Sequence, residues 1–365
     1  MIVGVPREIK NHEYRVAITP AGVHELTRRG HDVIIEKDAG LGSSIPNEEF
    51  VSAGAKLMDT AEEVWAAAEL VLKVKEPIAE EYGRMRSGQI LFTYLHLAAS
   101  RPCTDALIES GTTSIAYETV QLSDGSLPLL APMSEVAGRL APQVGFQHLM
   151  ASNGGRGVLP GGVSGVYPAD VVVIGAGVSG VNAAEVARGM GARVEILDLD
   201  VRKLRQVDAR FAGMITTVAS NSFAIEKAVT QADLVIGAVL VPGAKAPTLI
   251  SDDLVAQMRP GSVLVDIAID QGGCFESSRA TTHDDPTFMV HDSIFYCVAN
   301  MPGAVPRTST YALTNVTLPY AVALADKGWK QATDDDAALA AGLSTHAGAL
   351  LNTAVGDALG IDVAN

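Results

Sequence analysis

The sequence predicts an α/β protein of two domains, each built on a mostly parallel sheet, with long helices connecting them. The chain has 365 residues, which is enough for two domains that each bury a core of their own. Short apolar runs alternate with helical patterns along most of the chain, as expected when helical crossovers join parallel strands. Thirty-five glycines and only 5% aromatic residues also fit a fold with many short turns.

The N-terminal part of the chain contains several such units. Thr19 followed by Pro20 indicates the start of a helix, because threonine is a good N-cap and proline is accommodated in the first turn. We expect strands at residues 2–5, 33–36, 70–74, 90–95 and 114–116, and helices at about 20–29 and 61–68. Strands separated by helices imply parallel pairing.

The most informative local pattern lies within residues 170–200. An apolar run at 171–174 is followed by Gly175, Gly177 and Gly180, then by a helix at about 181–190 and a strand at 193–197 that ends at Asp198. Such glycines allow a tight turn, close approach of the backbone to a pyrophosphate, and close packing of the helix on the strand. The helix N-terminus offers N–H groups to phosphate, and the carboxylate accepts hydrogen bonds from a ribose. This part therefore predicts a doubly wound, parallel-sheet domain of the Rossmann type that binds NAD.

The remaining elements suggest how the two domains are divided. We expect Ser134 to cap a helix that ends near Met150, strands at 234–239, 263–269 and 293–297, and helices at 310–326, 336–343 and 345–359. Residues 153–165 are rich in glycine but lack the G-K-[ST] ending of a phosphate-binding loop, so we interpret them as a structural loop. The C-terminal helices are expected to return to the first domain. The predicted domains are therefore residues 1–128 with 306–365, which would hold the substrate, and residues 129–305, which would hold NAD.

The charge and the cysteines bear on the binding partners and the cellular compartment that the sequence predicts. There are 27 basic and 42 acidic residues, a net charge of −15, which disfavours binding to nucleic acid or to an anionic membrane. No apolar run approaches the length of a membrane span, and the N-terminus does not resemble a signal peptide. Cys103, Cys274 and Cys297 are too scattered for a disulfide framework or a metal site. We expect a cytoplasmic protein without a bound metal.

Charged and titratable side chains follow several of the expected strands. Lys75 follows the strand at 70–74, His96 follows 90–95, Asp270 follows 263–269, and Arg15 lies in the loop after the first strand. Open α/β sheets bind ligands at the carboxyl ends of their strands. Two cations suit a small carboxylate substrate, with the guanidinium able to bind it through two hydrogen bonds. An imidazole and a carboxylate suit proton transfer beside a nicotinamide.

Each of these side chains also has an ordinary structural interpretation. Lys75 could be a solvated residue at a strand end, and His96, within an apolar run, could be a core histidine with its hydrogen bonds satisfied. Asp270 could brace the turn at Gly272 and Gly273. Arg15 could pair on the surface with Glu8 or Glu13.

Longer stretches resemble a known family, the NAD-dependent L-alanine dehydrogenases. The similar stretches cover essentially the whole chain and include VGVPREIKNHEYRVAITPAG, LVLKVKEP, QILFTYLHLAAS, LAPMSEVAGRLAPQ, VVVIGAGVSG, DLVIGAVLVPGAKAP, VLVDIAIDQGGCFE and FYCVANMPGAVPRTST. The resemblance implies reversible oxidative deamination of L-alanine to pyruvate and ammonium with NAD as the cofactor. It also implies a homohexamer.

The resemblance also implies roles for individual residues. Arg15 and Lys75 match positions that hold the substrate carboxylate, His96 matches the residue that bonds the reacting oxygen, and Asp270 matches its acid–base partner. Tyr94, Met133, Asn300 and Met301 are expected to line the substrate pocket. Lys203 stands where the family often has arginine. The expected cofactor contacts are Ser134, Gly175, Ala176, Gly177, Val178, Gly180, Asp198, Lys203, Ser220, Val239, Leu240, Ile267, Ala268, Ile269, Asp270, Arg279, Val298, Ala299, Asn300 and Met301.

Other functions remain open at this point. The negative charge of Asp198 would repel a 2′-phosphate and so favours NAD over NADP, whereas Arg202, Lys203 and Arg205 could accept that phosphate. A nucleotide-binding module of a proton-translocating transhydrogenase would share this fold and some of the motifs. A saccharopine dehydrogenase would act on lysine-derived substrates. A sensor would bind NADH but would not oxidise alanine.

Overall fold

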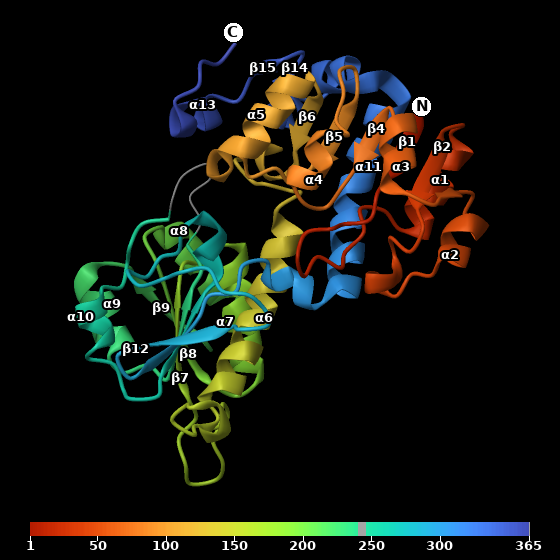
Figure 1. The fold of residues 1–365 in the computed structure, drawn as a ribbon. Helices are drawn as coiled ribbons and strands as arrows, with labels where there is room; N and C mark the ends of the chain where they lie inside the picture. Colours follow the sequence, from red (N-terminus) through yellow and green to blue (C-terminus); the bar gives the residue numbers. More distant parts are fainter. Residues whose placement is uncertain (240–245, 365) are drawn as a thin grey trace. The chain divides into compact units, whose positions relative to one another are not determined.

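The chain forms two compact units, and the first of them is discontinuous in sequence. In the computed structural model, the described residues are 1–239 and 246–364. The first unit contains Met1–Met133 and Val305–Asn365, and the second contains Ser134–Ala304 (Figure 1). Among the expected contact residues, Leu240 lies outside the described part of the chain.

The first unit is built on a mostly parallel sheet, as the alternation of strands and helices predicts. Within the described residues this sheet has eight strands in the order β15-β14-β6-β5-β4-β1-β2-β3. The six strands β6-β5-β4-β1-β2-β3 are parallel to one another. The strand β14 pairs antiparallel with both β6 and β15. The strands are β1 (Ile2–Val5), β2 (Asp32–Glu36), β3 (Lys56–Met58), β4 (Leu70–Leu72), β5 (Ile90–Thr93), β6 (Thr113–Ala116), β14 (Leu343–His346) and β15 (Ala349–Leu350).

The helices of the first unit bury their apolar sides against this sheet. Trp65 of α3 and Leu107 of α5, for example, belong to one buried cluster with the strand residues Val71 and Leu91. The helices are α1 (Pro20–Arg28), α2 (Asn47–Ser52), α3 (Ala61–Ala67), α4 (Ala79–Tyr82), α5 (Arg101–Ser110), α11 (Pro306–Asp335), α12 (Ala337–Ala341) and α13 (Thr353–Leu359). As predicted, α1 begins at Pro20 directly after Thr19, although the Thr19 side chain makes no capping hydrogen bond.

The second unit is a doubly wound sheet. In the part of the chain that the structure describes, its strands lie in the order β12-β13-β11-β10-β7-β8-β9, and all adjacent pairs are parallel except β12 with β13. The order reverses between β7 and β10, which is where such folds bind their ligands. The strands are β7 (Asp170–Ile174), β8 (Arg193–Asp198), β9 (Thr216–Ala219), β10 (Leu234–Gly237), β11 (Val263–Asp266), β12 (Thr287–Val290) and β13 (Ser293–Tyr296).

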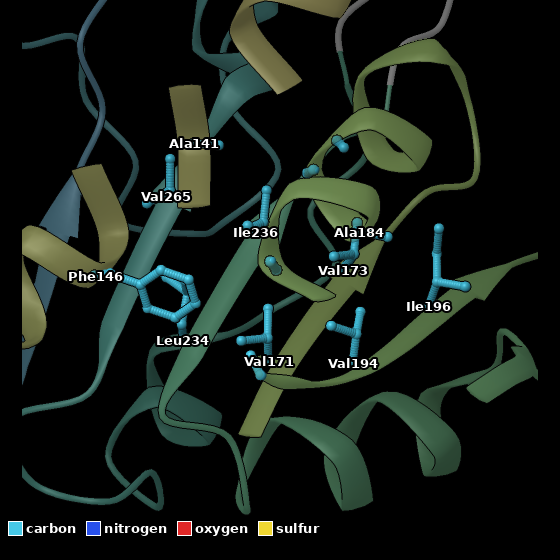
Figure 2. Packing of buried hydrophobic residues seen from close by; sticks show 14 of the residues in the cluster. Ala141, Phe146, Val171, Val173, Ala184, Val194, Ile196, Leu234, Ile236 and Val265 are labelled. Atoms are coloured by element: carbon cyan, nitrogen blue, oxygen red, sulfur yellow. The ribbon is translucent and has the colours of Figure 1, made fainter. Parts of the chain in front are cut away.

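The core of the second unit lies between this sheet and its helices. Figure 2 shows Val171, Leu234 and Ile236 of the central strands packed with Phe146 and Ala184 of two helices. Small side chains such as Ala184 let helix and sheet approach closely. The helices are α6 (Ala131–Leu149), α7 (Val178–Gly189), α8 (Val201–Phe211), α9 (Ser222–Val229) and α10 (Asp252–Val255).

Three expectations about local structure are wrong. Ser134 is not an N-cap, because α6 begins at Ala131. The strand expected at 263–269 ends at Asp266 and continues as the 3₁₀ helix η5 (Ile267–Gln271). The helix expected at 345–359 is confined to α13, because the preceding residues form the hairpin of β14 and β15.

The hairpin has a physical cause in its two turn residues. Ala347 and Gly348, between the paired residues His346 and Ala349, have φ values of 48° and 85°. Two consecutive residues with positive φ form the type of turn that matches the twist of an antiparallel hairpin. The sequence THAGAL therefore reverses the chain where its apolar pattern predicts a helix.

Candidate active site

Three expected site residues of the first unit follow neighbouring parallel strands. The strand order of this sheet reverses between β1 and β4, so the loops after those two strands lie at its topological switch point. Arg15 is in the loop after β1, and Lys75 follows β4. His96 follows β5, the next strand along. The sheet therefore places the two cations and the imidazole at the carboxyl ends of its central strands, where a ligand is expected.

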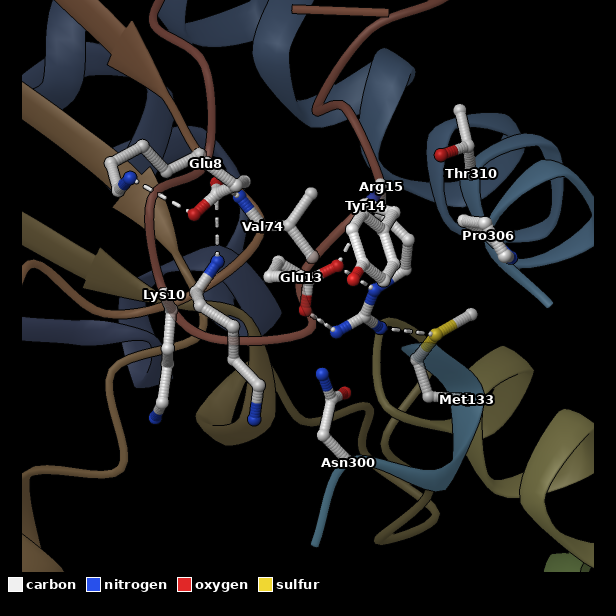
Figure 3. A network of polar contacts seen from close by, with 12 residues as sticks. Glu8, Lys10, Glu13, Tyr14, Arg15, Val74, Met133, Asn300, Pro306 and Thr310 are labelled. Carbon is white, nitrogen blue, oxygen red and sulfur yellow. Dashed lines mark hydrogen bonds and ion pairs between the residues drawn. The ribbon is translucent and has the colours of Figure 1, made fainter. Parts of the chain in front are cut away.

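Arg15 is buried and held by a carboxylate. Its side chain is 2% exposed, and that of Glu13 is fully buried. Its Nε donates to Glu13 Oε1 at 2.6 Å, its Nη2 donates to Glu13 Oε2, and its Nη1 lies 3.0 Å from Met133 Sδ (Figure 3). Burial lowers the pKa of Arg15, but Glu13 outweighs that effect and holds the pKa above its ordinary value. The predicted pairing with Glu13 thus exists, but inside the protein rather than on its surface.

A hollow lies beside Arg15 in the first unit. It has a volume of about 500 Å³ and is lined by residues 7–15 and by Asp38, Ala39, Leu41 and Gly42. A three-carbon acid is far smaller than this volume. The hollow therefore leaves room for a small carboxylate beside the loop that carries Arg15.

Lys75 lies next to a buried charged triad that sequence reasoning missed. Lys73, which is 0% exposed, has its Nζ 3.0 Å from Glu8 Oε2 and 2.8 Å from Glu81 Oε1. Both carboxylates are buried, and their charges raise the pKa of the lysine despite the opposing effect of burial. The sequence offers no local signal for this triad, because Glu8, Lys73 and Glu81 come from separate segments that only the fold brings together.

Glu8 also fixes the backbone from which Lys75 projects. Its Oε1 accepts hydrogen bonds from the N–H of Val74 at 2.6 Å and of Lys75 at 3.4 Å (Figure 3). The Lys75 side chain is buried, and among the described residues its Nζ has no hydrogen bond or ion pair. Burial raises the pKa of Glu8, whereas Lys73 opposes that shift. The triad therefore fixes the backbone of Lys75 without engaging its ammonium group.

His96 has a strained backbone that a neighbouring carboxylate supports. Its φ is 49° and its ψ is 38°, in the left-handed region that residues with a side chain seldom adopt. Glu118 accepts hydrogen bonds from the N–H of His96 at 2.6 Å and of Leu95 at 3.2 Å. The ring of Tyr94 stacks on the imidazole, with centroids 5.9 Å apart and planes at 14°. His96 is half-buried, and its ring has no hydrogen-bond partner within the described residues, so it is not a satisfied core histidine.

Tyr94 itself is held tightly within the first unit. Its hydroxyl donates to the carbonyl oxygen of Leu129 at 2.5 Å, and its ring meets the edge of Tyr117. Burial raises the pKa of Tyr94, against the lowering effect of the Arg15 charge. The phenol is therefore neutral and supports the imidazole beside it.

In the second unit, the three glycines of the glycine loop differ in the space around them. Gly175 has a φ of 108°, and a Cβ there would lie 2.6 Å from the carbonyl oxygen of Ala238. A Cβ on Gly180 would lie 1.8 Å from the carbonyl oxygen of Gly175. A Cβ on Gly177, by contrast, would meet nothing within 4 Å. Two of the glycines are thus needed by the fold, and the third keeps a space open at the start of α7.

Asp198 and Ser220 lie beside this loop. Asp198 Oδ2 accepts a hydrogen bond from the N–H of Ala176 at 2.7 Å, and its Oδ1 accepts one from Asp200 at the same distance. The N–H of Ser220 donates to the carbonyl oxygen of Asp198 at 3.0 Å, and the Lys203 Nζ lies 3.8 Å from its carboxylate. A carboxylate has about four acceptor positions, so Asp198 can still accept further hydrogen bonds. Val239 is near as well, because its side chain lies within reach of a Cβ on Gly175.

Asp270 lies in the 3₁₀ turn after β11 and is exposed. No hydrogen bond from its side chain exists among the described residues, so it does not brace the turn at Gly272 and Gly273. That role belongs to Asp266, a fully buried residue that the sequence prediction missed because it was placed inside the expected strand. Asp266 accepts hydrogen bonds from the N–H groups of Ala268 and Cys274.

The other expected contacts of the second unit are more scattered. Val298 is buried after β13, and Asn300, with a φ of 64°, precedes the buried Met301. Arg279 is exposed and stacks over the ring of Phe288 at 4.3 Å, and Ser134 lies in the first turns of α6. Among the described residues, no three His, Cys, Asp or Glu side chains are grouped so that they could hold a metal ion. None of the described helices is both long and apolar enough to cross a membrane.

Comparison with known proteins identifies the family. The model "Alanine dehydrogenase/PNT, N-terminal domain" matches residues 4–137, and "Alanine dehydrogenase/PNT, C-terminal domain" matches residues 141–353. An alanine dehydrogenase of Mycolicibacterium smegmatis is 70% identical over 97% of this chain and 96% of its own length. An alanine dehydrogenase of Methanococcus maripaludis is 57% identical over 98% and 96%.

Solved structures agree with this result. An L-alanine dehydrogenase superposes with a TM-score of 0.95 and 50% identity over 99% of both chains. A transhydrogenase from Sinorhizobium meliloti superposes with a TM-score of 0.82 and 27% identity over 97% of this chain and 100% of its own. The two-domain α/β architecture and the resemblance found in the sequence are both confirmed. The chain belongs to the alanine dehydrogenase family, a family of oxidoreductases.

Proposed function

We propose that this protein catalyses the reversible, NAD-dependent oxidative deamination of L-alanine to pyruvate and ammonium. The observation that carries the proposal is that Arg15, Lys75 and His96 follow the strands β1, β4 and β5, which are neighbours in one sheet. Two cations and an imidazole at a switch point suit a small carboxylate with a reacting oxygen or nitrogen next to it. The family supplies the reaction type that this set of groups fits.

The second unit is proposed to hold the cofactor. The space above Gly177 suits a pyrophosphate, which the free N–H groups at the start of α7 would bind. The carboxylate of Asp198 would accept the adenine ribose hydroxyls, and its charge favours NAD over NADP. When bound, NAD⁺ supplies the hydride acceptor for the substrate's α-carbon.

The first unit is proposed to bind and orient the amino acid. Arg15 offers the substrate carboxylate a planar guanidinium already fixed by Glu13, and Lys75 adds a second positive charge. A carboxylate held by two cations cannot rotate freely, and this reduces the entropic cost of reaching the reactive arrangement. Tyr94 and Met133, next to His96 and Arg15 respectively, would border the substrate methyl group.

His96 and Asp270 are proposed to move the protons. Oxidation of the amine gives an iminium, which takes up water and then loses ammonia through a carbinolamine. His96 would donate to or accept from the reacting oxygen, and Asp270 would serve the water and the nitrogen. A general acid or base in such a position contributes roughly 10²–10⁴-fold to the rate. Because these residues belong to different units, the proposed reaction needs both.

We further propose that the protein acts as a homo-oligomer, with a hexamer expected from the family. A supporting observation is the loop at residues 159–167 of the second unit, in which Val163 and Val166 form an isolated antiparallel bridge. Leu159, Val163, Val166 and Tyr167 are 58%, 62%, 63% and 83% exposed, an unusual cluster of large apolar side chains on a surface. Light scattering on the purified protein should give a mass near six chains, and a monomer at micromolar concentration would contradict this.

One assay separates the proposed function from its rivals. L-alanine and NAD⁺ should produce NADH, measured by its absorbance, whereas lysine-derived substrates and NADP⁺ should produce far less. Binding of NADH without alanine-dependent reduction would indicate a sensor or a transhydrogenase-type module instead. Comparable kcat/KM values with NADP⁺ would overturn the role given to Asp198.

A further inference from the structure

Asp266 is a buried carboxylate at the end of β11, and the turn that follows the strand is wrapped around it. It is 0% exposed. Its Oδ1 accepts a hydrogen bond from the N–H of Ala268 at 2.9 Å and lies 3.5 Å from Cys274 Sγ. Its Oδ2 accepts hydrogen bonds from the N–H of Cys274 at 2.8 Å and from Ser278 Oγ at 2.5 Å.

The energetics of this carboxylate are unusual. A buried charge is costly unless hydrogen bonds or an opposite charge compensate it. In the described part of the chain, no lysine or arginine forms an ion pair with Asp266, so its compensation comes from the donors of the turn. Burial raises its pKa, and the hydrogen bonds from Ser278, Cys274 and Ala268 oppose that rise. These hydrogen bonds therefore fix the backbone of the turn relative to the carboxylate.

That geometry determines where Asp270 lies. The turn is closed by hydrogen bonds from the N–H of Gly273 to Ala268 and of Gly272 to Ile269, at 3.1 and 2.9 Å. Gly273 has a φ of 77°, and a Cβ there would lie 2.8 Å from Asp266 Oδ2, so the turn passes close to the carboxylate. The Asp270 side chain has no hydrogen bond of its own within the described residues. Its position therefore depends on the backbone that Asp266 holds.

We propose that Asp266 is a positioning residue for catalysis, whose buried carboxylate holds the turn 267–274 so that Asp270 is presented for proton transfer. This inference rests on the proposed function of Asp270. It goes beyond that function because Asp266 is fully buried and, among the described residues, its carboxylate is bonded only to residues of its own segment, Ala268, Cys274 and Ser278. The alternative is that Asp266 only stabilises the fold, as any buried and satisfied carboxylate can.

The same unit contains a matched control for that alternative. Asp233 is also buried, at 3% exposure, but it precedes β10 at the opposite end of the sheet. It accepts a hydrogen bond from the N–H of Asp170 at 2.8 Å and pairs with Arg156 and Arg259. Asp233→Asn therefore reproduces the loss of a buried charge without disturbing the turn.

The experiment is a double-mutant cycle on the full-length protein. Asp266→Asn, Asp270→Asn, the double variant and Asp233→Asn are compared with the wild type in pyruvate amination with NADH and ammonium. Asp266→Asn should lower kcat by at least about tenfold, because its amide places a donor against the donors of the turn. In the Asp270→Asn background the same change should lower kcat by less than about twofold, and Asp233→Asn should leave kcat within about twofold of the wild type.

The outcomes distinguish this inference from the function on which it rests. Wild-type kcat in Asp266→Asn, or effects of the two substitutions that multiply, would overturn the positioning role while the proposed function stands. A wild type without alanine or pyruvate turnover would overturn the proposed function itself, and an Asp270→Asn variant with full activity would overturn the role of Asp270 on which this inference rests. If Asp266→Asn does not fold, Ser278→Ala keeps the carboxylate and removes one donor. Ser278→Ala should lower kcat in the otherwise wild-type protein and leave kcat unchanged in the Asp270→Asn background. An unchanged kcat in the otherwise wild-type protein would contradict the inference.

Discussion

His96 has a backbone conformation that costs of order 1 kcal/mol for a residue with a side chain, and the surrounding structure compensates for it. Glu118 accepts two N–H groups at this point of the chain, and Tyr94 stacks on the ring. Strain that neighbouring residues maintain in this way is common at functional sites, because it fixes a side chain in one place. The proposed proton-transfer role of His96 is consistent with that arrangement.

Substitution of the two proposed proton-transfer residues tests this role. His96→Ala and Asp270→Asn should each lower kcat by roughly 10²–10⁴-fold, because a general acid or base is lost. Their affinity for NADH, measured by fluorescence titration, should stay near that of the wild type. Near-full turnover in either variant would show that its assigned role is wrong. The exposed His24→Ala is a suitable control and should leave kcat unchanged.

The guanidinium of Arg15 gives a second prediction at this scale. Arg15→Lys should raise KM for pyruvate more than it lowers kcat, because an ammonium cannot both keep two hydrogen bonds to Glu13 and present a planar fork to the substrate. Steady-state kinetics measure both constants. The exposed Arg28→Lys serves as the control. An unchanged KM for pyruvate would contradict carboxylate binding at Arg15.

Elements were predicted well where one local pattern determined them. The glycine loop, the strand before it and the strand that ends at Asp198 follow from spacing alone. The hairpin at Ala347 and Gly348 was missed because an apolar run of that length suits either a helix or a strand pair, and only the φ values of the turn decide. The buried triad was missed for another reason, since burial of Lys73 depends on pairing between distant segments.

The triad of Glu8, Lys73 and Glu81 supports a prediction about stability. Lys73→Met would leave two buried carboxylates without their cation and should lower the free energy of unfolding by about 3–5 kcal/mol. Denaturant unfolding measures this. Lys56→Met, which breaks an exposed pair with Asp32, should lower the free energy of unfolding far less, because solvent screens that pair. Similar effects for the two variants would show that the buried network contributes little.

Substitutions of two glycines in the glycine loop should distinguish an effect on stability from an effect on NADH binding. Gly177→Ala adds a Cβ that meets nothing within 4 Å, so it should preserve the melting temperature but weaken NADH binding by filling the space left for the pyrophosphate. Gly180→Ala places its Cβ 1.8 Å from a carbonyl oxygen and should destabilise the protein. Thermal melting and NADH titration on both variants distinguish the two effects. Unaltered NADH affinity in Gly177→Ala would place the pyrophosphate elsewhere.

The whole molecule contains two doubly wound units, which carry different side chains at the carboxyl ends of their strands. The first carries cations and an imidazole after β1, β4 and β5, and the second carries the glycine loop and Asp198 after β7 and β8. The rule that ligands bind at the carboxyl ends of strands predicted the first set from the sequence, and the spacing of the glycines predicted the second. It could not find the residues that hold those sets in place, such as Glu8, Glu118 and Asp266, because these contacts join segments that only the fold brings together.

In the proposed reaction, a hydride passes from the α-carbon of alanine to NAD⁺ on this protein. The most direct measurement uses L-alanine deuterated at the α-carbon, with mass spectrometry of the products. We expect that the NADH formed carries one deuterium, that the pyruvate carries none, and that His96→Ala forms the same labelled NADH more slowly. NADH without deuterium, or no NADH formed from alanine, would contradict it.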